Sequence, residues 1–192
     1  MDRMLSFLLP RALDRSTAAG LLFVRLVGGT AMALHGAPKM MAATSWMGPG
    51  PVPGWLQALA AFAEFGGGIA WILGLATPLA SVGIAATMIV GIVIVHIPMS
   101  DPFIRLTVQG VDAGPGVPFG GLPAWFVRAG GRSPGGSGSS ELASLFTAIA
   151  VLLLGAGPGQ LSLDALLARR FFARRSSAAR DVEHAGKAAL VR

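Results

Sequence analysis

Four long apolar stretches constrain this chain of 192 residues more than any other feature. A hydrocarbon core about 30 Å thick requires roughly 20 apolar residues in an α-helix, and each stretch approaches that length. Because backbone groups in lipid must satisfy one another, such stretches form helices. The sequence therefore predicts an all-α, polytopic membrane four-helix bundle, with spans over residues 18–37, 55–75, 79–97 and 142–157.

The composition agrees with a membrane domain. Charged residues make up 12% of the chain, about half the usual share of a soluble domain. The chain has no cysteine, which excludes disulfides, thiolate nucleophiles and iron–sulfur ligation by its own side chains. A redox role would require a bound cofactor or a partner protein.

The basic residues lie mainly at the two ends of the chain. The net charge is +6, yet seven of the fifteen Lys and Arg residues follow Asp164 and three precede the first span. The positive-inside rule then predicts a multi-pass protein of a bacterial-type inner (plasma) membrane with both termini in the cytoplasm. The basic ends suit contact with the anionic lipid bilayer, and we expect no nucleic-acid partner.

The chain divides into four segments by composition. "GGRSPGGSGSS" has the composition of a flexible linker, so residues 130–140 are expected to be mobile on the outer face. Ser162 is a candidate N-cap for an amphipathic helix that follows the last span. The predicted segments are a basic interfacial segment at 1–17, a transmembrane domain at 18–158 with a long outer connection at 98–140, an interfacial amphipathic helix at 159–175, and a basic disordered tail at 176–192.

Three basic side chains interrupt the first span, "RLVGGTAMALHGAPKM". At 100° per residue, Arg25, His35 and Lys39 fall within a sector of roughly 80° on one face of a helix. A charge at the bilayer centre costs about 2.5–3.5 kcal/mol, so this face should contact protein rather than lipid.

An acidic partner for this face is available on the second span. Glu64 and Arg25 both lie near the middle of the membrane by residue count. An ion pair would offset much of the cost of burying either charge. We therefore expect Arg25 and Glu64 to form a direct or water-bridged pair.

The remaining polar residues gather at the outer edge and extend this pair into a polar column. Intramembrane ionisable groups are candidates for function, although each also has a structural explanation as an ion pair, a lipid anchor or a helix terminus. No metal site is predicted, and catalytic residues are not assigned. The candidate ligand-binding residues are Arg25, His35, Lys39, Glu64, His96 and Glu141.

Several segments resemble the DoxX family of membrane proteins. "LLFVRLVGGTAMALHGAPKM" is similar to the first helix of that family, and "AEFGGGIAWILGLATPLAS" to the second. "IVIVH" resembles the end of the third helix, and "ELASLFTAIAVLLLGAGPGQLSLDALL" the fourth. The resemblance implies a four-helix membrane bundle. It also implies an association with membrane oxidoreductase systems, since the family takes its name from a subunit type of thiosulfate:quinone oxidoreductase.

The leading functional hypothesis is a membrane subunit of a quinone-linked redox system. Its polar column would contact a quinone head group or a small anion, because a quinone carbonyl needs hydrogen-bond donors beside an apolar pocket. No covalently bound cofactor is expected, and other membrane subunits are expected partners.

Three alternatives stay open. The first is a non-catalytic accessory or scaffold subunit, and the second is a small transporter or lipid-handling bundle. A b-type haem between His35 and His96 is the alternative we favour least, because many helices carry a His near each end.

Overall fold

The computed structural model describes residues 14–107, 114, 116–131 and 138–170. The tail 176–192 lies outside these residues, as do most of the basic segment 1–17 and the centre of the linker at 130–140. The expectations for those three segments therefore stay predictions.

The described chain is mostly helical, as predicted. α4 continues without a break into one turn of π-helix, η1, and residues 163–170 form a further helical segment. Asp14 precedes the first helix and Pro53 the second, while the left-handed Gly74 ends the second. The bounds are α2 Arg15–Met41, α3 Gly54–Leu73, α4 Thr77–Gly91, η1 Ile92–His96 and α5 Glu141–Ala156.

Three of the described helices are long and apolar enough to cross a membrane, namely Arg15–Met41, Gly54–Leu73 and Thr77–His96. They confirm a multi-pass helical membrane protein. α5 is also apolar but has 16 residues, or about 24 Å at 1.5 Å per residue. It is shorter than the hydrocarbon core, so its role as a fourth span stays a prediction.

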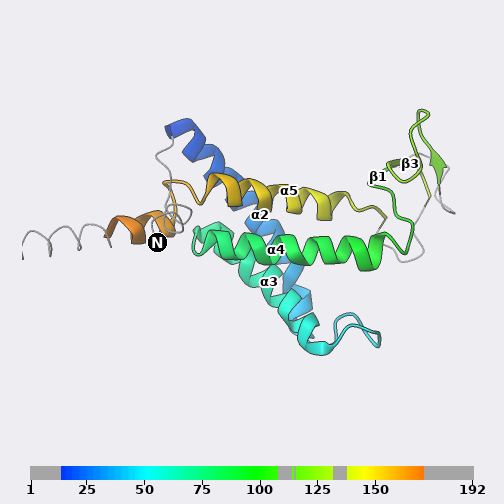
Figure 1. Ribbon diagram of the computed structural model, residues 1–192, viewed down its shortest axis with the longest axis horizontal. Coiled ribbons are helices and arrows are strands. Elements are labelled where there is room, and N and C mark those ends of the chain that lie inside the picture. Colours follow the sequence, from blue (N-terminus) through cyan, green and yellow to red (C-terminus); the bar gives the residue numbers. More distant parts are fainter. Residues whose placement is uncertain (1–13, 108–113, 115, 132–137, 171–192) are drawn as a thin grey trace, which may run out of the picture.

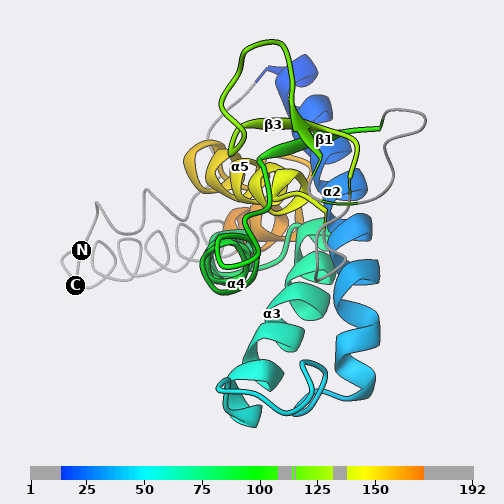
Figure 2. The same ribbon diagram turned by 90° about the vertical axis from the view of Figure 1, so that its right-hand side faces the viewer.

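The helices form two hairpins (Figure 1). α2 and α3 run side by side in opposite directions, and α4 packs against α5. Figure 2 shows α4 nearly end-on while α2 and α3 run across the view, so the two hairpins cross rather than lie parallel. We call the side with the turn 74–76 and residues 157–170 the terminal end, and the side with residues 42–53 and 97–107 the loop end.

Glycines allow α2 and α3 to approach closely. A Cβ atom on Gly29 would lie 2.7 Å from the carbonyl oxygen of Gly68, and one on Gly36 would lie 2.4 Å from the backbone nitrogen of Phe65. Side chains at these positions would force the backbones apart. Such small-residue contacts are the usual basis of helix packing in membranes, where lipid removes the hydrophobic drive between helices.

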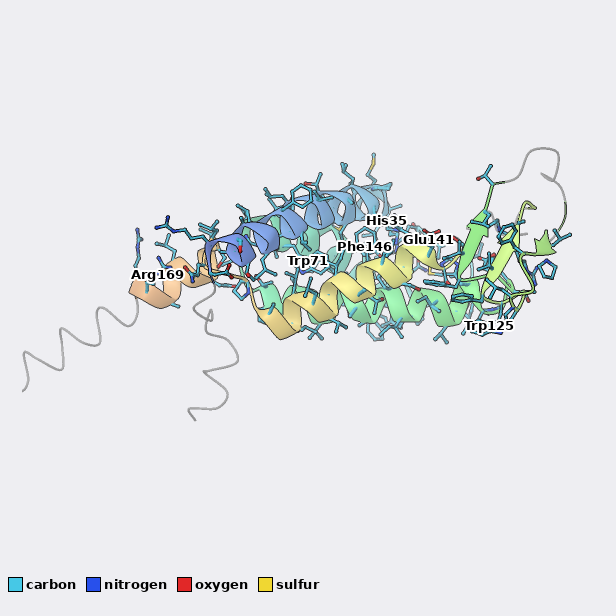
Figure 3. The ribbon with its side chains drawn as sticks, turned by 90° about the horizontal axis from the view of Figure 1, so that it is seen from above. His35, Trp71, Trp125, Glu141, Phe146 and Arg169 are labelled. Carbon is cyan, nitrogen blue, oxygen red and sulfur yellow. The ribbon has the colours of Figure 1, made fainter. Side chains whose placement is uncertain are left out.

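The core lies where the two hairpins cross. Trp71 of α3 is fully buried, and its indole nitrogen donates to Ser81 Oγ of α4 at 2.9 Å. Figure 3 shows Trp71 and Phe146 pointing into the space between the hairpins. The buried cluster comprises Leu21, Met32, Trp71, Ile84, Met88, Phe146, Ala150 and Leu153.

A small sheet lies in the long connection 98–140, where no strands were predicted. β1 (Ile104–Leu106) pairs in parallel with β3 (Val127–Ala129), and β2 (Val117–Pro118) pairs antiparallel with β3. The guanidinium of Arg105 donates to the carbonyls of Gly130 and Gly138 and so ties the sheet to the start of α5. The strands are too short to show an alternating pattern, so the sequence alone gave no signal for them.

Candidate functional site

Arg25 is fully buried at the terminal end, with 1% of its surface exposed. Its guanidinium donates to four backbone carbonyls. Two of them, Trp71 at 2.8 Å and Ile72 at 3.2 Å, belong to the end of α3. The others, Pro158 at 2.7 Å and Leu161 at 2.9 Å, belong to the segment after α5. Arg25 therefore joins three parts of the chain, and four of the five N–H groups of its guanidinium have carbonyl acceptors.

The predicted Arg25–Glu64 ion pair is wrong. Arg25 contacts the last turn of α3, whereas Glu64 lies seven residues before Trp71, about 10 Å away along the helix axis. Carbonyls freed at the helix C-terminus supply the acceptors that the prediction sought in a carboxylate. Counting residues along each span gave Arg25 a depth too near that of Glu64.

Asp164 is a second organising residue of the terminal end. It lies in the first turn of the last helical segment, as expected, and Ser162 Oγ accepts from Ala165 N at 3.1 Å as the predicted N-cap. The Asp164 carboxylate also accepts from the backbone of Ala76 at 2.8 Å and Thr77 at 3.0 Å, at the start of α4. It therefore caps a helix far from it in sequence, which spacing alone does not reveal.

Glu64 pairs with Lys39 at the loop end. The Lys39 ammonium lies 2.7 Å from Glu64 Oε1 and 2.6 Å from Oε2. The Glu64 side chain is 3% exposed and that of Lys39 is 17% exposed. The ammonium also lies 4.5 Å from the ring centre of Trp46. Lys39 thus points into the protein and does not extend to the lipid surface as a simple anchor.

This pair borders a pocket of about 590 Å³ at the loop end. The pocket lies between the loop-end halves of the two hairpins, which diverge from the turn 74–76 (Figure 1). Four of the six predicted site residues line it: His35, Lys39, Glu64 and His96. Arg25 does not, because it lies at the opposite end of the bundle.

Part of the pocket wall is apolar and also exposed on the outer surface. Leu59, Val90 and Ile94 line it and remain 58%, 52% and 43% exposed on the outer surface of apolar helices. Because exposed apolar helix surfaces suit lipid, this part of the pocket wall is within reach of the bilayer. A lipid-soluble molecule could enter without crossing an aqueous phase.

Gln57 holds the loop that closes one side of the pocket. The residue is 4% exposed. Its amide nitrogen donates to the Val52 carbonyl at 3.0 Å, and its amide oxygen accepts from Met47 N at 3.0 Å. The Trp46 indole nitrogen donates to the Gln57 carbonyl at 2.9 Å. The sequence analysis missed Gln57, although a polar residue in the first turns of an apolar span was a usable signal.

His96 lies in the π-helical turn η1 and is held by Asp101. Its Nδ1 is 2.9 Å from Asp101 Oδ2, and the Asp101 carboxylate is fully buried. Arg105 Nη2 lies 4.0 Å from the other oxygen of that carboxylate. Single π-turns inside helices occur often at functional sites. Asp101 was also missed, since it lies beyond the apolar span.

His35 and Glu141 differ in their relation to the pocket. His35 lines it as an exposed side chain of α2. Glu141 is not among the lining residues and begins α5 beside the sheet, where its charge suits the helix N-terminus (Figure 3). Ala143, one half-turn later, is the α5 residue that lines the pocket.

The pocket can bind an uncharged molecule that has an apolar body and a polar head. The two oxygens of Glu64 compensate the charge of Lys39 and accept hydrogen bonds from it. An ammonium has three N–H donors, so Glu64 does not use all of them. Among the described residues, no group of three or more His, Asp or Glu side chains could hold a metal ion.

Comparison with known families matches residues 20–97 to the DoxX family model. Comparisons with curated proteins and with solved structures gave no match. The matched residues include most of α2, all of α3 and α4, and the π-turn η1 with His96. The family match confirms the resemblance seen in the sequence over residues 20–97, and the apolar helices show a multi-pass membrane protein.

Proposed function

We propose that the chain is a membrane subunit of a quinone-linked redox system, and that the loop-end pocket binds the quinone head group. The observation that supports this most is the pocket itself, which is lined by the exposed apolar side chains of Leu59, Val90 and Ile94 and carries the Lys39–Glu64 pair in its wall. A quinone with its isoprenoid tail has this combination of apolar body and polar head.

The lining residues fit such a head group. The Lys39 ammonium and the His35 ring can donate to the quinone oxygens, and Glu64 fixes the ammonium in place. Since Lys39 is already neutralised by Glu64, an uncharged head group suits the pocket better than a small anion. A bound quinone supplies electron-carrier chemistry, while the residues of this chain bind, orient and shield it from water.

Electron transfer to or from the quinone requires a second protein. The chain has no cysteine for a thiol or iron–sulfur relay. We therefore propose a partner subunit that carries the electron donor or acceptor.

The proposal is tested by filling the pocket. Ala60 lines the pocket, whereas Leu79 is 75% exposed on the outer face of α4. Ala60→Phe should lower the affinity for decylubiquinone at least about tenfold, because the added ring occupies the head-group volume. Leu79→Phe, which adds bulk toward lipid, should leave it unchanged. Calorimetric titration in detergent measures both, and equal affinities in the two variants would refute the proposed site.

A second candidate is an accessory subunit that docks other proteins through its sheet. Phe119, Leu122 and Trp125 of the sheet region are 50%, 42% and 70% exposed. Trp125 points away from the sheet in Figure 3. A stoichiometric partner that co-purifies with the native chain and is lost in Trp125→Ala, with quinone affinity unchanged, would favour this function.

We further propose that the protein resides in a bacterial-type inner membrane with both termini in the cytoplasm. The support is the concentration of Lys and Arg residues at the two ends of the chain. The pocket then lies at the outer side of the membrane. A fused reporter after Arg192 should be active if it requires the cytoplasm, and activity of a reporter that works only in the periplasm would contradict this orientation.

A further inference from the structure

The His96–Asp101 contact points to a specific form of the ligand. We infer that Asp101 fixes the tautomer of His96, and that the pocket therefore prefers a reduced, hydroxyl-bearing aromatic head group, a quinol, to the oxidised quinone. The inference rests on the proposed quinone site and deepens it.

Asp101 lies near a cationic side chain. Its carboxylate is fully buried, with Arg105 Nη2 4.0 Å from Oδ1. Arg105 stays protonated and lies four residues further along the chain, in β1. A cation at this distance favours the ionised carboxylate, which can only accept hydrogen bonds.

The Asp101 carboxylate in turn contacts the ring of His96. Because the carboxylate only accepts, the 2.9 Å contact places the imidazole hydrogen on Nδ1. In a neutral ring the other nitrogen, Nε2, is then an acceptor. Within the described part of the chain, Asp101 is the one hydrogen-bond partner that the structure gives to the His96 ring.

His96 brings this acceptor to the pocket. His96 is part of its wall, and its side chain is 14% exposed. An acceptor in an apolar wall is matched by a ligand that donates. A quinol hydroxyl donates, whereas a quinone carbonyl and an aryl ether do not, and would leave Nε2 without a partner.

Asp101 is a positioning residue in this arrangement, since it acts on the ligand through His96. It is also held in its own place, because its backbone nitrogen donates to the His96 carbonyl at 3.0 Å. Replacement by asparagine keeps the size and shape of the side chain. The amide nitrogen of asparagine can donate to Nδ1, which moves the ring hydrogen to Nε2 and turns the acceptor into a donor.

The test compares three probes on the full chain in lipid nanodiscs under anaerobic conditions: duroquinol, duroquinone and the dimethyl ether of duroquinol. Calorimetry with the unaltered protein should show duroquinol binding about fivefold to tenfold more tightly than the other two, the effect of one unpaired hydrogen-bonding group. Asp101→Asn should reverse the order of duroquinol and duroquinone. A purely structural role for Asp101 would weaken all probes equally.

The outcomes separate the two proposals. Binding of none of the three probes to the unaltered protein refutes the quinone pocket itself. Binding of all three with equal affinity, or an unchanged order in Asp101→Asn, refutes the tautomer inference and leaves the pocket intact. Asp101→Glu, which retains the carboxylate, should keep the preference for duroquinol. If Asp101→Asn fails to fold, His96→Gln is compared instead. Glutamine can both donate and accept, so it should remove the preference, and a preserved preference would overturn the inference.

Discussion

The terminal end and the loop end of the bundle both bury charge, but they do so in different surroundings. At the terminal end, Arg25 directs its guanidinium at four carbonyls, and protein atoms surround it on all sides. At the loop end, Lys39 and Glu64 compensate each other and border a cavity of about 590 Å³. A buried charge inside a membrane domain is therefore a site for a ligand only where space remains beside it.

The two ends also differ in how much of the fold depends on them. Arg25 connects α2, the end of α3 and residues 158–161, so its loss would affect several elements together. The Lys39–Glu64 pair connects α2 and α3, which glycine contacts such as that between Gly29 and Gly68 also hold together. The comparison predicts larger stability effects at the terminal end and larger binding effects at the loop end.

The largest expected effect is that of Arg25→Met. Hydrogen bonds from a charged donor contribute about 1.5–3 kcal/mol each, so the loss of four should destabilise the fold by about 6 kcal/mol or more. Thermal unfolding in detergent measures this loss, and Arg25→Lys should show an intermediate value because an ammonium reaches fewer carbonyls. The quinone affinity of the folded fraction should stay unchanged. A loss of affinity without a loss of stability would break the distinction between the two ends.

A smaller effect is expected from Lys39→Met, which leaves the buried Glu64 carboxylate unpaired. We expect a loss of about 2–3 kcal/mol, below the usual range for a fully buried pair because Lys39 is partly exposed. The double variant Lys39→Met/Glu64→Gln should regain most of the stability but none of the quinone affinity. Recovery of both together would show that the pair serves the fold alone.

Asp164→Ala should cost about 1 kcal/mol, the usual value of a lost helix cap. Two backbone donors at the start of α4 lose their acceptor in this variant. Asp164→Asn keeps one acceptor oxygen and should lose less. Unfolding curves of the two variants give the difference. Equal stabilities for Asp164→Ala and the unaltered protein would show that Asp164 does not stabilise the terminal end.

An effect of similar size to that of Asp164→Ala is expected from Trp46→Phe. The variant keeps an aromatic ring near the Lys39 ammonium but loses the donor to the Gln57 carbonyl, which should cost about 0.5–1.5 kcal/mol. Trp46→Leu removes the ring as well and should lower the stability by about a further 0.5 kcal/mol. If the two variants were equally stable, the contact between Trp46 and Lys39 would contribute nothing.

The apolar periods of the sequence predicted the helices well, because long apolar runs in lipid have few alternatives to an α-helix. The predicted first span, 18–37, extends in the structure to Arg15–Met41. Its last turns carry Lys39 and also Pro38, which a length rule based on apolar residues omits. The sheet at residues 104–129 was not predicted, since its strands have two or three residues each.

The candidate site was predicted in part. The helical periodicity placed His35 and Lys39 on one face of the first span, and both line the pocket. The predicted partner of Glu64 was wrong, since Glu64 pairs with Lys39. Arg25 instead donates to carbonyls after α5, and these acceptors cannot be identified by counting residues along the second span. The contact between Asp101 and His96 could not be predicted, because it depends on how the connection after η1 folds. The position of a carboxylate outside the apolar spans does not indicate which histidine it contacts.

The contacts of Arg25 also bear on how the protein assembles during synthesis. Two of its four acceptors, at positions 158 and 161, leave the ribosome about 60 residues after the end of the domain match at residue 97. Until then the first three helices hold a guanidinium with half of its partners and an α4 start that lacks its Asp164 cap. The matched segment by itself thus lacks contacts that both Arg25 and the start of α4 make with later residues. Truncated chains that end near residue 97 should be substrates for membrane quality-control proteases, and completion of the chain through residue 164 should end that exposure.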